Sequence, residues 1–164
     1  MLTVGSLFSG IGGLDLGLER AGMQVIWQSE IDPYACKVLS KHWPKVPNHG
    51  DIKAINWGNI VRPDVICGGY PCQPFSTAGK RNGADDPRHL WPWVREAISQ
   101  LRPKYAILEN VRGHITLGLS EVLGDLASNG VRRGMANCFR KLCWCATSQR
   151  ANHYFGLPLA TVQQ

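Results

Sequence analysis

Apolar and polar positions alternate in blocks along the first 128 residues, and each block predicts one strand or one helix. Short apolar runs are typical of buried strands. They span residues 2–8, 23–30, 64–70 and 104–111. Apolar residues at helical spacing, or helix-start pairs such as Asp-Pro, mark the segments between them. These span residues 14–22, 32–43, 88–101 and 116–130. This order predicts an α/β fold with a doubly wound, mostly parallel sheet.

Two features at the carboxyl ends of the predicted strands favour an adenosine-type ligand, because ligands bind at that edge of such sheets. The sequence "FSGIGG" at 8–13 allows a tight turn and a close backbone approach. Glu30 follows roughly 20 residues later, where an acid commonly binds ribose hydroxyls. The glycine spacing is not G-x-G-x-x-G, so this turn alone is a weak signal. A solvated glutamate at a strand end is the alternative.

The sequence "CGGYPCQPFS" at 67–76 places Cys72 in a stiff loop that follows another strand. A lone cysteine is more often a small buried residue. A thiol at a strand end is a candidate nucleophile if its pKa is lowered. Glu109 emerges at the top of the strand at 104–111, where a carboxylate is costly unless it is paired or used, and it is a candidate general acid. A glutamate that only orients a loop is the alternative.

Composition, charge and cysteine spacing narrow the class of protein. The length of 164 residues suits one domain, and no run of about 20 apolar residues predicts a membrane span. The start lacks a basic stretch before its apolar run, so we expect a cytoplasmic protein with reduced cysteines. Cys143 and Cys145 are spaced C-x-C, which does not favour a metal site, and we expect none. Residues 1–128 hold 13 Lys/Arg and 12 Asp/Glu, whereas residues 129–164 hold five Lys/Arg and no acid.

Five motifs, in this order, resemble those of the carbon-5 cytosine-specific DNA methyltransferases over about residues 3–128. They are "FSGIGGLDLGLERAG" (8–22), "EIDPYA" (30–35), "GDI" (50–52), "GGYPCQPFS" (68–76) and "LENV" (108–111). The resemblance implies a Rossmann-like S-adenosylmethionine-dependent methyltransferase fold. It also implies DNA methylation of the restriction-modification kind, with S-adenosylmethionine as cofactor and double-stranded DNA as partner.

The resemblance also implies a role for each matching residue. Cys72 would attack carbon 6 of a flipped-out cytosine while Glu109 contacts ring nitrogen 3, so that carbon 5 can take the methyl group. Residues implied to contact the cofactor are Phe8, Ser9, Gly10, Ile11, Gly12, Gly13, Glu30, Ile31, Asp51, Ile52, Pro71 and Leu90. Residues implied to contact the substrate are Pro71, Gln73, Ser76, Asn110 and Val111. Residues 76–88 would form a loop that closes over DNA.

Residues 129–164 do not resemble the continuation of the family. We therefore expect a cofactor-binding and catalytic core at 1–128 and a poorly ordered, non-family tail at 129–164. The sheet would be truncated before its last strands, and its open edge would favour association. Read one nucleotide later, residues 131–158 admit codons for the Gly-Ala-Pro-His-Arg motif of the family. This suggests a frameshift near Asn129, which the coding DNA would test.

Three other readings stay open. The chain is a non-catalytic cofactor-binding fragment or half of a split enzyme, or it is an RNA methyltransferase relative, since some relatives with these motifs modify transfer RNA. An unrelated redox or nucleotide-binding protein could reuse the fold. For the DNA methyltransferase reading, we expect little or no methyl transfer by this chain alone.

Overall fold

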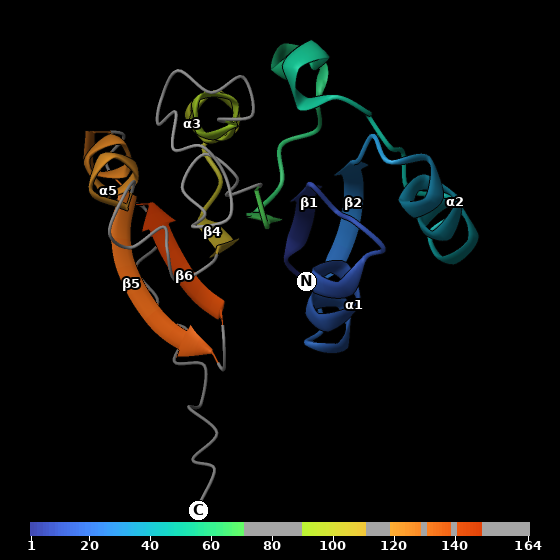
Figure 1. Ribbon diagram of the computed structural model, residues 1–164, viewed down its shortest axis with the longest axis horizontal. Helices are drawn as coiled ribbons and strands as arrows, with labels where there is room; N and C mark the ends of the chain where they lie inside the picture. Colours follow the sequence, from blue (N-terminus) through green and yellow to red (C-terminus); the bar gives the residue numbers. More distant parts are fainter. Residues whose placement is uncertain (71–89, 111–118, 129–130, 139–140, 149–164) are drawn as a thin grey trace, which may run out of the picture.

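The computed structural model describes residues 1–70, 90–110, 119–128, 131–138 and 141–148 (Figure 1). These residues form a six-stranded sheet with the order β2-β1-β3-β4-β6-β5. Its first four strands in chain order are β1 (Thr3–Leu7), β2 (Gln24–Ser29), β3 (Val65–Gly68) and β4 (Tyr105–Asn110). β1 pairs in parallel with β2 and β3, and β3 pairs in parallel with β4. The predicted parallel sheet and its four strands are therefore confirmed.

Four α-helices in the described residues match the predicted ranges, and α1 begins one residue earlier than predicted. They are α1 (Gly13–Arg20), α2 (Pro33–His42), α3 (Trp91–Leu101) and α5 (Leu119–Ser128). Two short 3-10 turns, η1 (Ile52–Ala54) and η2 (Trp57–Asn59), follow α2. α2 begins where the sequence predicts, because the Asp32 carboxylate accepts a hydrogen bond from the Ala35 N–H at 2.8 Å and Pro33 fits the first turn. Pro92 likewise lies in the first turn of α3, where no hydrogen bond is lost.

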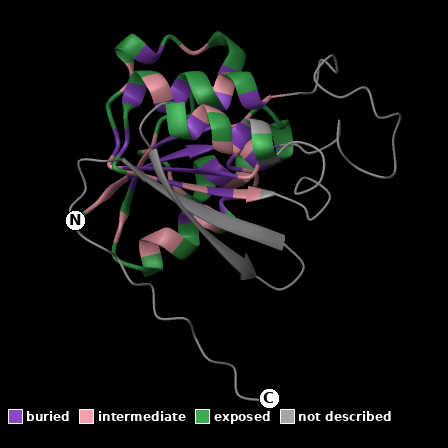
Figure 2. Cartoon of the chain, turned by 90° about the vertical axis from the view of Figure 1, so that its left-hand side faces the viewer, coloured by how far each residue is buried: buried purple, intermediate pink, exposed green. Residues whose placement is uncertain are grey.

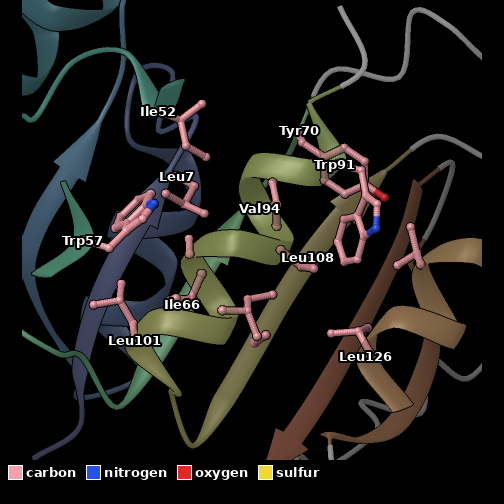
Figure 3. Close-up of a cluster of buried hydrophobic side chains, with 14 of the residues drawn as sticks. Leu7, Ile52, Trp57, Ile66, Tyr70, Trp91, Val94, Leu101, Leu108 and Leu126 are labelled. Atoms are coloured by element: carbon pink, nitrogen blue, oxygen red, sulfur yellow. The ribbon is translucent and has the colours of Figure 1, made fainter. Parts of the chain in front are cut away.

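Helices cover both faces of the sheet, which explains why the strands are apolar on both sides (Figure 2). The larger core cluster packs side chains of α3 and α5 on Leu7, Ile66 and Leu108 (Figure 3). Tyr70 and Trp91 close one end of this cluster, with ring centroids 5.8 Å apart. The opposite face carries Val4, Val25, Val65 and Cys67, against which the α1 residues Leu14 and Leu18 pack.

Two further strands extend the sheet beyond β4. β6 (Lys141–Ser148) pairs antiparallel with β4, and β5 (Val131–Cys138) pairs antiparallel with β6 (Figure 1). The assignment of residues 129–164 to a separate, non-family tail stays a prediction. Sheet pairing uses backbone N–H and C=O groups, so the open edge of β4 can pair with a hairpin whose side-chain pattern is unlike that of the family. The frameshift near Asn129 stays a hypothesis, which the coding DNA would test.

Along the described part of the chain, we find no helix with the length and apolar character that crossing a membrane requires.

Candidate functional site

The chain turns sharply between β1 and α1, at the carboxyl end of β1. Three residues of this turn have a positive φ: Phe8 at 51°, Gly10 at 55° and Gly12 at 86°. Such angles are easy for glycine and strained for a phenylalanine. The Ser9 N–H donates to the Ser29 carbonyl at 3.3 Å, which ties the turn to the end of β2. The turn leads directly into the amino end of α1, where backbone N–H groups favour anions and polar ligands.

Glu30 lies directly after β2, and its carboxylate faces this turn. Oε2 accepts a hydrogen bond from the Gly10 N–H at 2.8 Å. Oε1 accepts from the N–H groups of Ile31 and Asp32, each at 2.8 Å. An ionised carboxylate can accept about four hydrogen bonds, so these three contacts leave Oε2 with capacity for a ligand hydroxyl. The structure thus joins two predicted site segments, the glycine turn and Glu30, through one direct hydrogen bond.

The third predicted cofactor segment, residues 50–52, is tied to the same end of β2. The Ser29 hydroxyl donates to the Gly50 carbonyl at 2.7 Å. Asp51 is exposed and caps η1 by accepting a hydrogen bond from the Lys53 N–H at 3.0 Å. Ile52, however, is only 4% exposed and belongs to the main core. Its expected contact with the cofactor could therefore come only from its backbone, not from its side chain.

The remaining described cofactor candidates differ in exposure. Ile31 is 67% exposed and Ile11 is 62% exposed, so both side chains are accessible to a ligand. Phe8 is half-buried and packs against the main core. Leu90 is half-buried and precedes α3 as its N-cap. Gly13 is the first residue of α1.

A buried polar network lies beneath the turn, and the apolar pattern of the sequence does not predict it. Asp15 in the first turn of α1 is fully buried. Its carboxylate accepts hydrogen bonds from the Ser6 hydroxyl at 2.9 Å and from the Gln28 side-chain amide at 3.0 Å. The Ser9 hydroxyl donates to Ser6 Oγ at 2.9 Å, which connects the network to the turn. Burial raises the pKa of Asp15, and the two hydrogen bonds partly oppose that rise.

Glu109 is half-buried near the end of β4 and lies against the end of β3. A Cβ atom placed on Gly69 would be 2.7 Å from Glu109 Oε2. The missing side chain at Gly69 therefore gives the carboxylate its space. Gly69 stands three residues before Cys72 in the sequence, so Glu109 lies next to the backbone that leads into the predicted nucleophile loop.

Several predicted site residues lie outside the described residues. They are Pro71, Cys72, Gln73, Ser76 and Val111. Asn110 is described as the last residue of β4. The roles that the resemblance implies for these six residues stay predictions.

The two cysteines that the structure describes fully, Cys36 and Cys67, are free thiols. Burial raises the pKa of Cys67 to about 12, and the nearby Asp15 adds to this effect, so Cys67 is an inert core thiol. Within the described ranges, no three His, Cys, Asp or Glu side chains gather in a way that could hold a metal ion.

Comparison with known proteins identifies the family. The model of the C-5 cytosine-specific DNA methylases matches residues 2–129, so this chain belongs to that family. The chain is 41% identical over 116 residues to the type II methyltransferase M.BsuFI of Bacillus subtilis, which covers 70% of this chain and 28% of that protein. It is 46% identical over 111 residues to the type II methyltransferase M.HgiBI of Herpetosiphon aurantiacus, which covers 65% of this chain and 25% of that protein. The chain thus spans about a quarter of the length of these curated relatives.

Solved structures show the same fold. A Spodoptera frugiperda DNMT2 mutant superposes with a TM-score of 0.73 at 22% identity, covering 95% of this chain and 53% of that chain. The predicted Rossmann-like methyltransferase fold is therefore confirmed.

Proposed function

We propose that this chain carries the S-adenosylmethionine site and the attacking residues of a DNA (cytosine-5-)-methyltransferase. The observation that carries the proposal is the Glu30 carboxylate, which binds the Gly10 N–H and keeps capacity for a ribose hydroxyl. Family membership supports S-adenosylmethionine as the nucleoside and DNA as the methylated partner. The exposed side chains of Ile11 and Ile31 offer apolar surface beside that carboxylate.

In the proposed reaction, the Cys72 thiolate adds to carbon 6 of a flipped-out cytosine and forms a carbon–sulfur bond. Glu109, beside Gly69, contacts ring nitrogen 3 and stabilises the electron density that the addition moves into the ring. Carbon 5 becomes enamine-like and would take the methyl group from the sulfonium of S-adenosylmethionine, whose methyl–sulfur bond breaks to leave S-adenosylhomocysteine. Loss of the carbon 5 proton to water and elimination of the thiolate then restore the aromatic ring and free Cys72.

The proposal assigns this chain only part of the work of a full-length relative, because it spans 28% of M.BsuFI and 25% of M.HgiBI. The described residues provide three segments at one edge of the parallel sheet: the turn at 8–13 after β1, Glu30 after β2 with residues 50–52, and Glu109 near the end of β4. Recognition of a DNA sequence is not assigned to any of them. We therefore expect little or no methyl transfer by this chain alone.

A trapping experiment tests the proposal. The full chain is mixed with S-adenosylmethionine and duplexes that contain 5-fluorocytosine, with and without the C-terminal remainder of M.HgiBI. Fluorine cannot leave as a proton does, so the adduct after methyl transfer persists and intact mass reveals it. We expect an adduct in the supplemented mixture, little or none with the chain alone, and none with Cys72→Ser. An adduct that survives Cys72→Ser would contradict the assigned nucleophile. Cofactor binding without any adduct would favour a non-catalytic cofactor-binding fragment.

A further inference from the structure

A short stretch after α2, at residues 47–49, runs beside the edge strand β2. The Gln28 N–H donates to the Pro47 carbonyl at 2.9 Å, and the His49 N–H donates to the Gln28 carbonyl at 2.8 Å. Gln28 and Asn48 form an isolated parallel bridge. This pairing places Asn48 close to the point where β2 ends and Glu30 follows.

The Asn48 side chain continues this pairing beyond the end of β2. Its Oδ1 accepts a hydrogen bond from the Glu30 N–H at 3.0 Å, and its Nδ2 donates to the Glu30 carbonyl at 3.1 Å. The side-chain amide therefore binds both polar groups of the Glu30 backbone, as the backbone of a neighbouring strand would. Oδ1 also accepts from the Gly50 N–H at 3.1 Å, and Nδ2 also donates to Cys36 Sγ at 3.2 Å. Two donors meet the oxygen and two acceptors meet the nitrogen, so the full capacity of the amide is used.

These contacts connect two segments that the proposed function assigns to one ligand. Glu30 is the proposed ribose ligand, and Gly50 leads directly to Asp51, which the family resemblance implies to contact the cofactor. The Ser29 hydroxyl adds a second link, to the Gly50 carbonyl at 2.7 Å. We propose that Asn48 is a positioning residue of the nucleoside site, which acts through Glu30 and sets its carboxylate against residues 50–52. The inference rests on the proposed function, because it takes Glu30 as the ribose ligand.

Asn48 could instead serve only the local turn, and the chain contains a matched control for that role. Asn56 is also exposed, and its Oδ1 accepts a hydrogen bond from the N–H two residues later, at Gly58, over 3.1 Å. Asn48 makes the same turn with Gly50. The Asn56 side chain caps η2 locally, whereas the Asn48 side chain extends to Glu30. Asn56→Ala therefore removes an equivalent turn contact without touching the proposed ribose ligand.

The two variants of Asn48 separate its contacts. Asn48→Ala removes all four hydrogen bonds. Asn48→Asp keeps the oxygen that accepts from Glu30 and Gly50, but it places a second oxygen against the Glu30 carbonyl, where the wild type has a donor. If Asn48→Ala does not fold, as far-UV circular dichroism would reveal, Asn48→Asp tests the same link with the turn retained.

Calorimetric titration of the full chain measures its affinity for two ligands. One is S-adenosylhomocysteine, and the other is its analogue that lacks the ribose 2′- and 3′-hydroxyls. We expect Asn48→Ala and Asn48→Asp to weaken S-adenosylhomocysteine binding about tenfold, the equivalent of one to two net hydrogen bonds. The analogue should lose less than about twofold, because the hydroxyls that Glu30 would bind are missing. Asn56→Ala should bind both ligands as the wild type does.

Each other outcome overturns a stated part. Equal weakening of both ligands would mean that Asn48 serves the fold and not the ribose contact. Wild-type binding by both Asn48 variants would mean that Glu30 is positioned without Asn48. A wild type that binds both ligands equally well would remove Glu30 as the ribose ligand and this inference with it. A wild type that binds neither ligand would overturn the proposed function itself.

Discussion

Replacing each of three glycines in the turn after β1 by alanine should change the free energy of unfolding by a different amount. Gly13 is the first residue of α1, and a Cβ placed there would meet nothing within 4 Å. Gly10 has equally open space but a φ of 55°. Gly12 has a φ of 86°, and a Cβ would lie 2.3 Å and 2.5 Å from two ring atoms of Trp43. The series therefore separates backbone strain from side-chain collision.

The expected magnitudes follow from these contacts. Gly13→Ala should leave the free energy of unfolding unchanged or raise it by up to about 1 kcal/mol, since alanine favours helix. Gly10→Ala adds strain of about 1–2 kcal/mol, offset by about 0.4–1 kcal/mol from a less flexible unfolded chain, and should cost about 1 kcal/mol. Gly12→Ala must also move the Trp43 ring, whose Nε1 donates to Glu19 Oε2 at 2.9 Å. Losing that charge-assisted hydrogen bond adds about 1.5–3 kcal/mol, so the total should be about 3 kcal/mol.

Urea denaturation of the full chain, followed by far-UV circular dichroism, measures all three variants. The matching change in melting temperature is about 2–4 °C per kcal/mol for a chain of this size, so Gly12→Ala should melt about 6–12 °C lower. Equal destabilisation by Gly10→Ala and Gly12→Ala would show that Trp43 does not pack on the turn. Gly13→Ala as the most damaging change would refute the geometry of the turn.

Three further predictions concern charge and the Glu109 position. The Lys104 ammonium holds the pKa of Asp64 at about 2, below its ordinary 3.8. The stability that the ionised Asp64 contributes is therefore present above pH 3.8 and is lost as the pH falls through about 2. The urea midpoints of wild type and Asp64→Asn should differ at pH 7 and converge near pH 2. Burial raises the pKa of Asp15, so its contribution is fully present below pH 3.8 and declines as the pH rises through the raised value. We therefore compare the free energies of unfolding of wild type and Asp15→Asn. The wild-type value minus the variant value should fall between pH 3 and pH 7 with a slope of at most about 1.4 kcal/mol per pH unit. A difference that stays constant with pH would contradict the burial of Asp15. Gly69→Ala should leave the free energy of unfolding within about 0.5 kcal/mol of wild type, because only the flexible end of Glu109 must move, yet it should abolish the adduct in the supplemented trapping mixture.

Sequence patterns predict the parallel sheet well because its strands are buried on both faces and so consist of short apolar runs. Helix starts are equally easy to predict, since the Asp32 cap and Pro33 stabilise the start of α2 within one turn of the chain. The position of Glu30 follows from the same logic, because it is the first residue after an apolar strand. These local signals are enough to place the candidate site at one edge of the sheet.

Contacts between residues far apart in the sequence cannot be predicted from such local patterns. Asn48 binds Glu30 across 18 residues, and Gln28 reaches Asp15 across 13 residues. In the sequence, the buried network shows itself by polar residues at otherwise apolar positions: Ser6 and Gln28 in strands and Asp15 in a helix. The pairing of β5 and β6 with β4 escaped prediction for another reason, because backbone groups form it and composition does not encode it. The burial of Ile52 likewise depends on how η1 packs on the sheet.

The binding of S-adenosylmethionine by the full chain tests the central claim most directly. Calorimetric titration should give one site per chain for the wild type. Glu30→Gln keeps the shape of the side chain but replaces one carboxylate oxygen by an amide donor, so it cannot satisfy the N–H groups of Gly10, Ile31 and Asp32 together and bind a ribose hydroxyl as well. We predict at least about a tenfold loss of affinity for Glu30→Gln, the equivalent of about 1.4 kcal/mol. A wild type that binds no S-adenosylmethionine, or a Glu30→Gln variant that binds it as tightly as the wild type, would contradict the account.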